Sequence, residues 1–193
     1  VAGSVEAAGL REVGGDFKVW GGALPQVQSI DPEQPDHVGY SPAVSGIALN
    51  FNRVHCEWKR GSKGWSVSMD ARTQKYRPEV AMARMWVKKR ALPVYTYADR
   101  GGTDTWTVAS QALGNGGSRW LPVRRPAEYA GDVFRTLARS HGIALRKAKV
   151  TQNLPPTHAP AHHQSPPLSV TLKAMPKYSN TLIAAMGGMP ATP

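Results

Sequence analysis

Apolar and polar residues alternate along residues 47–70, and this pattern predicts a β-hairpin. The apolar positions are Ile47, Leu49, Phe51, Val54, Cys56, Trp58, Trp65, Val67 and Met69. A period of two is typical of a strand with one buried face. The phase changes after Phe51, which predicts a β-bulge near Asn52-Arg53. Residues 59–64 are rich in Gly and Lys and predict the turn between the strands.

Shorter patterns of the same kind surround the hairpin. A short helix is predicted to include Val5 to Leu10 and to stop at Gly14-Gly15, and a strand is predicted around Phe17 and Val19. Further strands are predicted at Val80–Val87, Val94–Tyr97, Thr105–Ala109 and Arg119–Val123. Glycine-rich turns separate the later strands, and a proline-rich loop covers residues 25–42. This part of the chain is therefore predicted to be mainly antiparallel β structure.

The spacing of apolar residues becomes helical after Pro126. Tyr129, Val133, Phe134 and Leu137 fall on one face, and Gly142 supplies a stop. These features predict a helix over Pro126–His141. Residues 154–167 are rich in proline and histidine, which predicts an extended linker. A second helix is predicted from Pro167 to Met175, where Pro176 interrupts it.

Composition agrees with a β-rich α+β fold that has a packed core. Of 193 residues, 41% are hydrophobic and 19% are charged, while 19 glycines and 16 prolines favour many turns. Cys56 is the single cysteine, which excludes an intrachain disulfide and predicts a buried structural thiol. No apolar stretch approaches the length of a transmembrane helix. Residues 1–20 lack the pattern of a signal peptide, so we expect a mature protein or a piece of a longer one.

The chain is basic, with 24 Lys and Arg against 13 Asp and Glu and a formal charge of +11. This charge fits an anionic partner, such as cell-wall polymer, membrane headgroups or nucleic acid, and it also fits an ordinary basic surface. Aromatic residues stand among cations at Trp58-Lys59-Arg60 and in residues 86–90, where they could stack on bases. Packing in alternating strands also explains them, so no nucleic-acid partner is expected.

Two clusters could in principle bind small ligands. His158, His162 and His163 could contribute to a metal site, but no carboxylate or thiol lies nearby in the sequence, so a solvated loop is predicted. Gly114–Gly117 is followed by a strand pattern and not by a helix, which favours a turn over a phosphate-binding loop. No metal and no cofactor are expected.

Nucleophilic serine chemistry needs a serine beside a group that activates it. The sequence contains no G-x-S-x-G, no serine followed three residues later by lysine, and no K-T-G. One partial motif remains, Ser179-Asn180-Thr181, which directly follows Lys177-Tyr178. The alternative reading of Ser179 is that it caps the helix that follows.

Four stretches, in chain order, resemble low-molecular-mass class C penicillin-binding proteins, which are D-alanyl-D-alanine carboxypeptidases and endopeptidases. Ser45–Asn52 is similar to a strand of that family that ends in Asn-x-Asn, and Glu128–Gly131, continuing to Gly142-Ile143, is similar to its helix before the catalytic domain resumes. Ser165–Met175 resembles the helix that leads into the family's S-x-N motif, and Lys177–Ala184 resembles that motif itself. Ala8–Val13 fits the family as well.

The resemblance implies a catalytic domain that is interrupted by an accessory insertion. S-x-x-K would precede the insertion and K-T-G would follow much later. We therefore expect residues 1–157 to be a β-rich accessory region. Residues 158–193 would be a linker and the first helical piece of the returning penicillin-binding, serine β-lactamase-like domain, so that the chain is an internal fragment.

The resemblance also implies an activity. The parent protein would cleave the terminal D-alanine of peptidoglycan stem peptides through an acyl-serine intermediate, would bind β-lactams, and would lie in the periplasm or cell envelope. Ser179 would relay a proton during acylation. Thr181 stands where the family has Asn and lacks its amide, with Asn180 shifted by one position. The fragment alone is expected to be inactive; the alternative is a non-catalytic basic module that binds anionic polymer.

Overall fold

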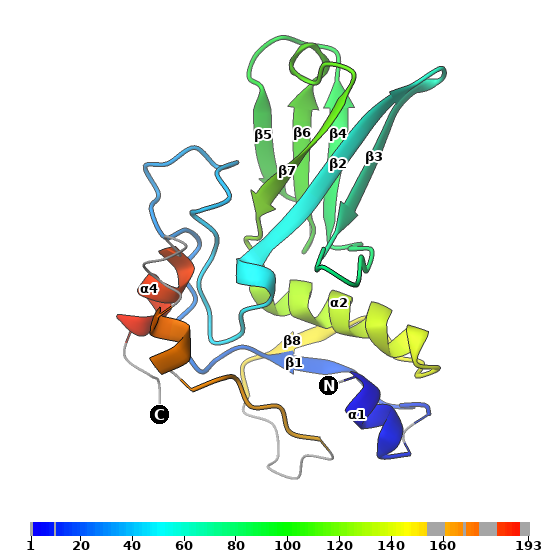
Figure 1. Ribbon diagram of the computed structural model, residues 1–193, viewed down its shortest axis with the longest axis vertical. Helices are drawn as coiled ribbons and strands as arrows, with labels where there is room; N and C mark the ends of the chain where they lie inside the picture. Colours follow the sequence, from blue (N-terminus) through cyan, green and yellow to red (C-terminus); the bar gives the residue numbers. More distant parts are fainter. Residues whose placement is uncertain (1, 10, 154–160, 168, 174–180, 190–193) are drawn as a thin grey trace.

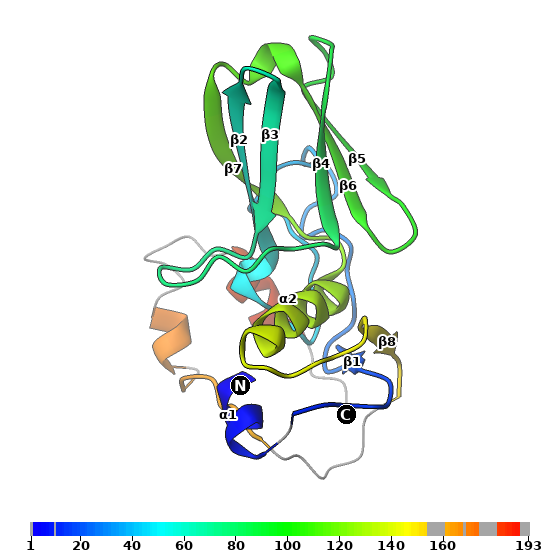
Figure 2. The ribbon, with the colours of Figure 1, turned by 90° about the vertical axis from the view of Figure 1, so that its right-hand side faces the viewer.

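The computed structural model describes residues 2–9, 11–153, 161–167, 169–173 and 181–189. Two three-stranded sheets stand face to face, and helix α2 (Pro126–Ser140) lies across their lower ends (Figures 1 and 2). A small two-stranded sheet lies on the other side of α2 (Figure 1). The described chain is thus an α+β fold in which strands supply most of the core.

The first sheet has the strand order β3-β2-β7 and is antiparallel throughout. Its strands are β2 (Arg53–Gly61), β3 (Gly64–Asp70) and β7 (Gly116–Pro122). Strands β2 and β3 form the predicted hairpin, with a turn of two residues between Gly61 and Gly64. The central strand β2 pairs along its other edge with β7, from Arg53 opposite Pro122 to Lys59 opposite Gly116.

The predicted hairpin begins too early, because residues 47–51 are not a strand. Asn50, Phe51 and Asn52 have φ values of 52°, 56° and 48°, and they form the 3₁₀ turn η1 (Asn50–Asn52) before β2 begins. Asparagine tolerates this left-handed conformation better than most residues. Asn52 is fully buried; its side chain accepts from the Leu49 N–H at 3.1 Å and donates to the Ala43 carbonyl at 2.9 Å.

The second sheet has the order β4-β6-β5 and is mixed. Its strands are β4 (Ala83–Lys88), β5 (Tyr95–Asp99) and β6 (Asp104–Ala109). Strands β5 and β6 form an antiparallel hairpin, while β4 pairs with β6 in parallel. The prediction of mainly antiparallel strands is therefore confirmed for β2–β3, β2–β7 and β5–β6, whereas β4 with β6 and the small sheet are parallel. The short 3₁₀ turn η2 (Ser110–Ala112) follows β6.

The core lies between the two sheets and is closed at one end by α2. Trp106, Val108, Val54 and Leu121 are almost completely buried there, together with Tyr129 of α2. Full burial of each such side chain is worth roughly 1.5–3 kcal/mol. Cys56 is also buried in this core, as predicted, and burial raises the pKa of its thiol to about 12.

Helix α2 packs closely on the small parallel sheet of β1 (Lys18–Trp20) and β8 (Lys149–Thr151). A Cβ atom on Gly131 would lie 2.5 Å from the Cβ of Ala148 and 2.9 Å from Val19, so only glycine fits this contact. The predicted helix and the predicted first strand are both confirmed. The first helix is α1 (Ala2–Ala7); a turn at Gly9, with φ 83°, follows it, so the helix does not extend to Gly14-Gly15.

The last part of the chain contributes two short helical segments. Residues 169–173 are helical, in agreement with part of the predicted second helix, and α4 spans Thr181–Gly187. Val170 and Leu172 remain 54% and 39% exposed, whereas Leu182 of α4 is 3% exposed. No helix among the described residues has the length and apolar character needed to cross a membrane.

Candidate functional site

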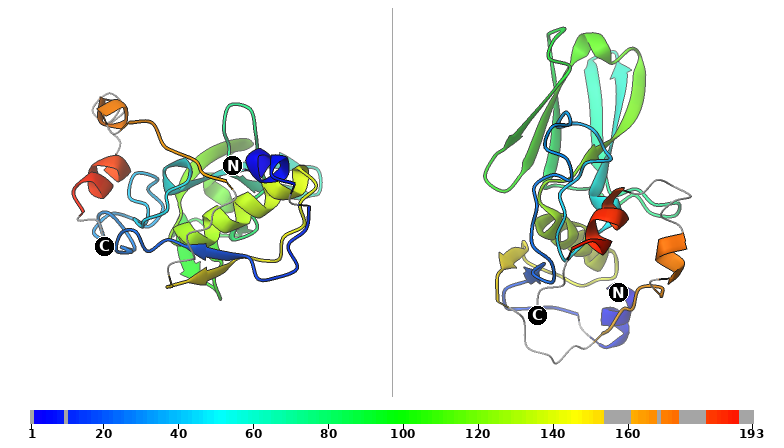
Figure 3. Two further views of the ribbon diagram at one scale, coloured as in Figure 1. Left: turned by 90° about the horizontal axis from the view of Figure 1, so that it is seen from below. Right: turned by 90° about the vertical axis from the view of Figure 1, so that its left-hand side faces the viewer.

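The partial serine motif lies at the start of α4. Ser179 and Asn180 fall outside the described residues, and Thr181 is the first residue of the helix. The Thr181 hydroxyl donates a hydrogen bond to the backbone carbonyl of Tyr40. Helix α4 thus rests beside the long loop between β1 and β2 (Figure 3, right). Of the predicted site residues, Thr181 is the one that the structure places.

That loop is held to the core by a buried arginine. Arg124 is 4% exposed and lies two residues after the end of β7. Its guanidinium donates to the carbonyls of Ser41 at 2.7 Å, Asp36 at 2.8 Å and Gln28 at 3.0 Å. A guanidinium has five N–H donors in a fixed plane, so one side chain can fix three loop carbonyls at once. Arg124 thus holds the residue next to Tyr40, whose carbonyl accepts the hydrogen bond from Thr181 of α4.

A buried carboxylate supports the anchor from the second sheet. Asp104, at the start of β6, accepts hydrogen bonds from the backbone N–H of Arg124 and from the Tyr97 hydroxyl, both at 2.9 Å. It is fully buried, and burial raises its pKa to about 6. Burial also raises the pKa of Tyr97 above its ordinary value. The two sheets, the loop and α4 are thereby connected through one polar network.

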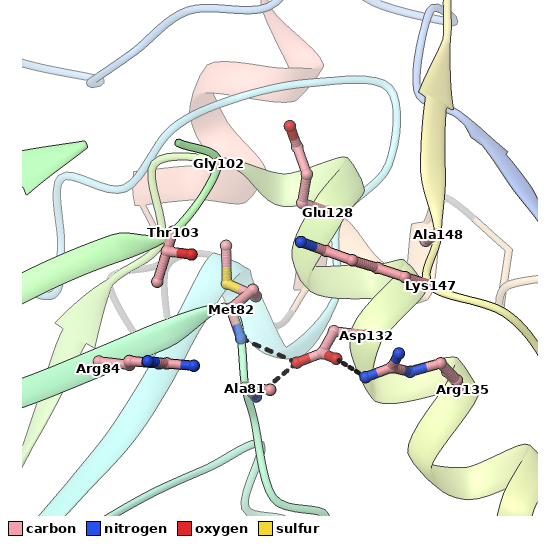
Figure 4. Close-up of a pocket in the computed structure, with 10 residues that line it drawn as sticks. All are labelled: Ala81, Met82, Arg84, Gly102, Thr103, Glu128, Asp132, Arg135, Lys147 and Ala148. Carbon is pink, nitrogen blue, oxygen red and sulfur yellow. Dashed lines mark hydrogen bonds and ion pairs between the residues drawn. The ribbon is translucent and has the colours of Figure 1, made fainter. Parts of the chain in front are cut away.

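A separate pocket lies where the second sheet meets α2 (Figure 4). Its volume is about 210 Å³, and its walls come from residues within 81–84, 102–103, 128–135 and 147–148. Figure 4 shows Arg84, Thr103 and Lys147 pointing from three different segments toward the same space. The floor carries Asp132, with Glu128 one helical turn earlier on the same face of α2.

Both acids of the pocket are already bonded to donors. The Asp132 carboxylate accepts from the backbone N–H groups of Ala81 at 2.6 Å and Met82 at 3.0 Å. Its other oxygen accepts from Arg135 at 3.2 Å. Glu128 forms an ion pair with Arg125. The segment that Asp132 holds connects the first sheet to the second. Just before it, the Val80 N–H donates to the Met69 carbonyl of β3, and just after it β4 begins at Ala83.

The other sequence candidates do not form a site among the described residues. His162 and His163 are exposed, and His158 lies outside the described part. Within the described ranges, no group of three His, Cys, Asp or Glu side chains could hold a metal ion. The predicted turn is confirmed at Gly114 and Asn115, whereas Gly116 and Gly117 already belong to β7.

Sequence reasoning missed the pocket. Its one local signal is the polar stripe Glu128, Asp132 and Arg135 on α2, at the i, i+4 and i+7 positions of a helix whose opposite face is apolar. Such a stripe is usually a solvated face. The partners in residues 81–84, 102–103 and 147–148 come together only in the folded chain.

Comparison with known proteins places the chain among peptidases. A family model described as "D-Ala-D-Ala carboxypeptidase 3 (S13) family" matches residues 1–188. No curated protein sequence matches the chain.

Two solved structures share the fold. The first is penicillin binding protein 4 (dacB) from Haemophilus influenzae, with a TM-score of 0.61 and 16% identity over 98% of this chain and 45% of that one. The second is the same Haemophilus influenzae protein complexed with a novel β-lactam, with a TM-score of 0.57 and 16% identity over 94% of this chain and 39% of that one. The chain thus spans less than half the length of these proteins.

Proposed function

Because the chain belongs to the D-Ala-D-Ala carboxypeptidase 3 (S13) family, we propose that it forms part of a serine-type D-alanyl-D-alanine carboxypeptidase of the cell envelope. The match of the family model to residues 1–188, nearly the whole chain, carries this proposal. The shared fold with a penicillin-binding protein supports it. The substrate would be the stem peptides of peptidoglycan, and β-lactams would act as inhibitors.

In this proposal the chain divides in two. Residues 1–157 are the accessory region, which comprises the three sheets and α2, and residues 158–193 are the linker and the beginning of a penicillin-binding domain. The core supports the division, because the members of its buried cluster lie between Val54 and Val133. Helix α4 is bonded to the loop between β1 and β2 through Thr181 and buries Leu182, which fits the first helical piece of a second domain.

The proposed chemistry is acyl transfer through serine. The serine oxygen attacks the carbonyl of the penultimate D-alanine, the terminal D-alanine leaves, and water then hydrolyses the acyl-serine. The attacking serine would need a lysine three residues later, and the present sequence contains no such pair. Ser179 would serve as the proton relay. We therefore infer that these 193 residues acylate only when the missing motifs are joined to them.

Labelling with a fluorescent penicillin tests the proposal. The 193-residue chain should form no covalent adduct, whereas the product of the extended reading frame should form one adduct per molecule. In the extended protein, Ser179→Ala should slow acylation by about 10²-fold or more, as expected for loss of a proton-transfer group. Thr181→Asn should speed it, because an amide returns at the third motif position; Thr181→Ser, which adds no amide, is the control.

Two results would overturn the proposal. A stoichiometric adduct on the 193-residue chain would show that it needs no further motif. An extended protein that is folded but never labelled would remove the carboxypeptidase assignment.

The formal charge of +11 favours a second candidate, a non-catalytic module that binds anionic polymer. Co-sedimentation with peptidoglycan and with DNA over a salt series separates the two partners, because binding to phosphates weakens steeply as salt rises.

A further inference from the structure

Two cations of the pocket in Figure 4 have no anionic partner. Arg84 projects from β4 and Lys147 from the segment between α2 and β8, and both point into the pocket (Figure 4). Neither side chain forms a hydrogen bond or an ion pair with any residue in the part of the chain that the structure describes. Arg135, by contrast, is bonded to Asp132. The pocket therefore presents two available positive charges to solvent.

The pocket's carboxylates do not neutralise these charges directly. Asp132 already accepts three hydrogen bonds, and Glu128 is paired with Arg125. The hydroxyl of Thr103 also faces the cavity (Figure 4). A fork of guanidinium donors, an ammonium group and a hydroxyl form a donor set that suits a carboxylate.

The size of the pocket limits what can enter it. Its volume of about 210 Å³ is below the roughly 300 Å³ at which pockets for whole small molecules begin. A carboxylate on a short side chain or at a peptide end fits this space, and the rest of such a ligand must lie outside. The two acids on the pocket wall disfavour a polyphosphate chain, which would bring a negative charge with each unit.

An aromatic surface lies next to the pocket along β4. Trp86 is two residues after Arg84, on the same face of the strand, and is 54% exposed. Two residues of a strand span about 7 Å, which is close to the width of one sugar ring. The face of a sugar ring carries C–H groups, and the broad apolar surface of tryptophan can pack against it.

We propose that Arg84, Lys147 and Trp86 form a non-catalytic binding site for an amino sugar that carries a peptide with a free carboxylate, that is, a muropeptide. The carboxylate lies between Arg84 and Lys147, and the sugar packs on Trp86. The choice of a cell-wall ligand rests on the proposed function, while the carboxylate pocket rests on its own geometry. The site would hold the accessory region on the polymer during cleavage.

Isothermal titration of the 193-residue chain tests the site. The probes are a soluble disaccharide tetrapeptide, the free tetrapeptide, inorganic phosphate and a short DNA duplex. Arg84→Gln and Lys147→Gln should each weaken binding of the disaccharide tetrapeptide by about 10-fold, since each removes a charge-assisted hydrogen bond. Trp86→Ala should weaken binding of the disaccharide tetrapeptide and leave that of the free tetrapeptide unchanged.

Lys63→Gln is the matched control, because it removes one exposed charge at the β2–β3 turn, far from the pocket. It should leave binding unchanged. Equal binding of the disaccharide tetrapeptide by the wild-type chain and both pocket variants would overturn the proposal. Absence of binding of the disaccharide tetrapeptide would also overturn it. The same holds if phosphate or DNA binds more strongly than the disaccharide tetrapeptide and Arg84→Gln weakens that binding equally. Penicillin labelling of the extended protein is read separately, so failure of the site leaves the carboxypeptidase assignment standing, and the reverse also holds.

Discussion

Asp104 is a fully buried carboxyl group that ties the second sheet to Arg124. Its burial raises its pKa to about 6, from an ordinary value of 3.8. Well below pH 3.8 the group is neutral in both the folded and the unfolded chain. Above pH 6 the folded chain must hold a charge in its interior that the unfolded chain holds in water. Stability from this group is therefore lost as the pH rises from about 4 to about 6.

We expect the wild-type chain to lose roughly 3 kcal/mol of unfolding free energy over this interval relative to Asp104→Asn, from about two pKa units at 1.36 kcal/mol each. At low pH the Asn variant should be close to the wild type, because a protonated carboxyl, like an amide, offers one accepting oxygen and one donor, and the Tyr97 hydroxyl can accept as well as donate. Urea unfolding at half-unit steps of pH measures the difference. Glu33→Gln, an exposed change, should follow the wild-type pH profile. Parallel profiles for wild type and Asp104→Asn would contradict the assignment.

The loop between β1 and β2 has little regular structure and takes its position from Arg124. The three carbonyls that this side chain holds belong to Gln28, Asp36 and Ser41. The same loop presents the Tyr40 carbonyl to Thr181. Substitution of Arg124 should therefore weaken the attachment of α4, because the loop connects the two.

Arg124→Met should remove the anchor while keeping an apolar chain of similar length. We expect a loss of about 3 kcal/mol or more, because the buried carbonyl of Ser41 and the part-buried carbonyls of Gln28 and Asp36 lose a charged donor. Hydrogen exchange followed by mass spectrometry should show faster exchange in residues 28–41 and at the start of α4, with the core strands protected. Arg100→Gln, at an exposed position, should show neither effect. Faster exchange confined to β7 would mean that Arg124 does not position the loop.

The sequence predicted these elements unevenly. The hairpin, the later strands and α2 were predictable, because their apolar residues repeat with the period of one local structure. The pattern failed at Leu49 and Phe51, where a left-handed turn interrupts the alternation. The parallel pairing of β4 with β6 was not predictable, because it depends on contacts between segments that are separated in the chain. The pocket was missed for the same reason.

At the level of the whole chain, the described residues after 160 contribute no member to the buried core cluster between the sheets. Leu182 is the one residue in the described segments after position 160 that is buried. We expect a chain that stops after residue 157 to keep a cooperative unfolding transition, with a midpoint no more than about 12 °C below that of the full chain, since burial of one leucine is worth roughly 1.5–3 kcal/mol. Calorimetry of both chains measures this. Loss of the transition would place the domain boundary elsewhere.

The parallel pairing of β1 with β8 has a consequence for how such a unit can be joined to another protein. Lys18 pairs with Lys149, so the segment between β1 and β8 begins and ends at neighbouring positions. The two strands also run in the same direction, so the chain after this segment continues in the direction in which it entered. Nearby entry and exit points are the condition under which a segment can be spliced into a surface loop of a host domain without stretching that loop. The segment between β1 and β8 meets this condition.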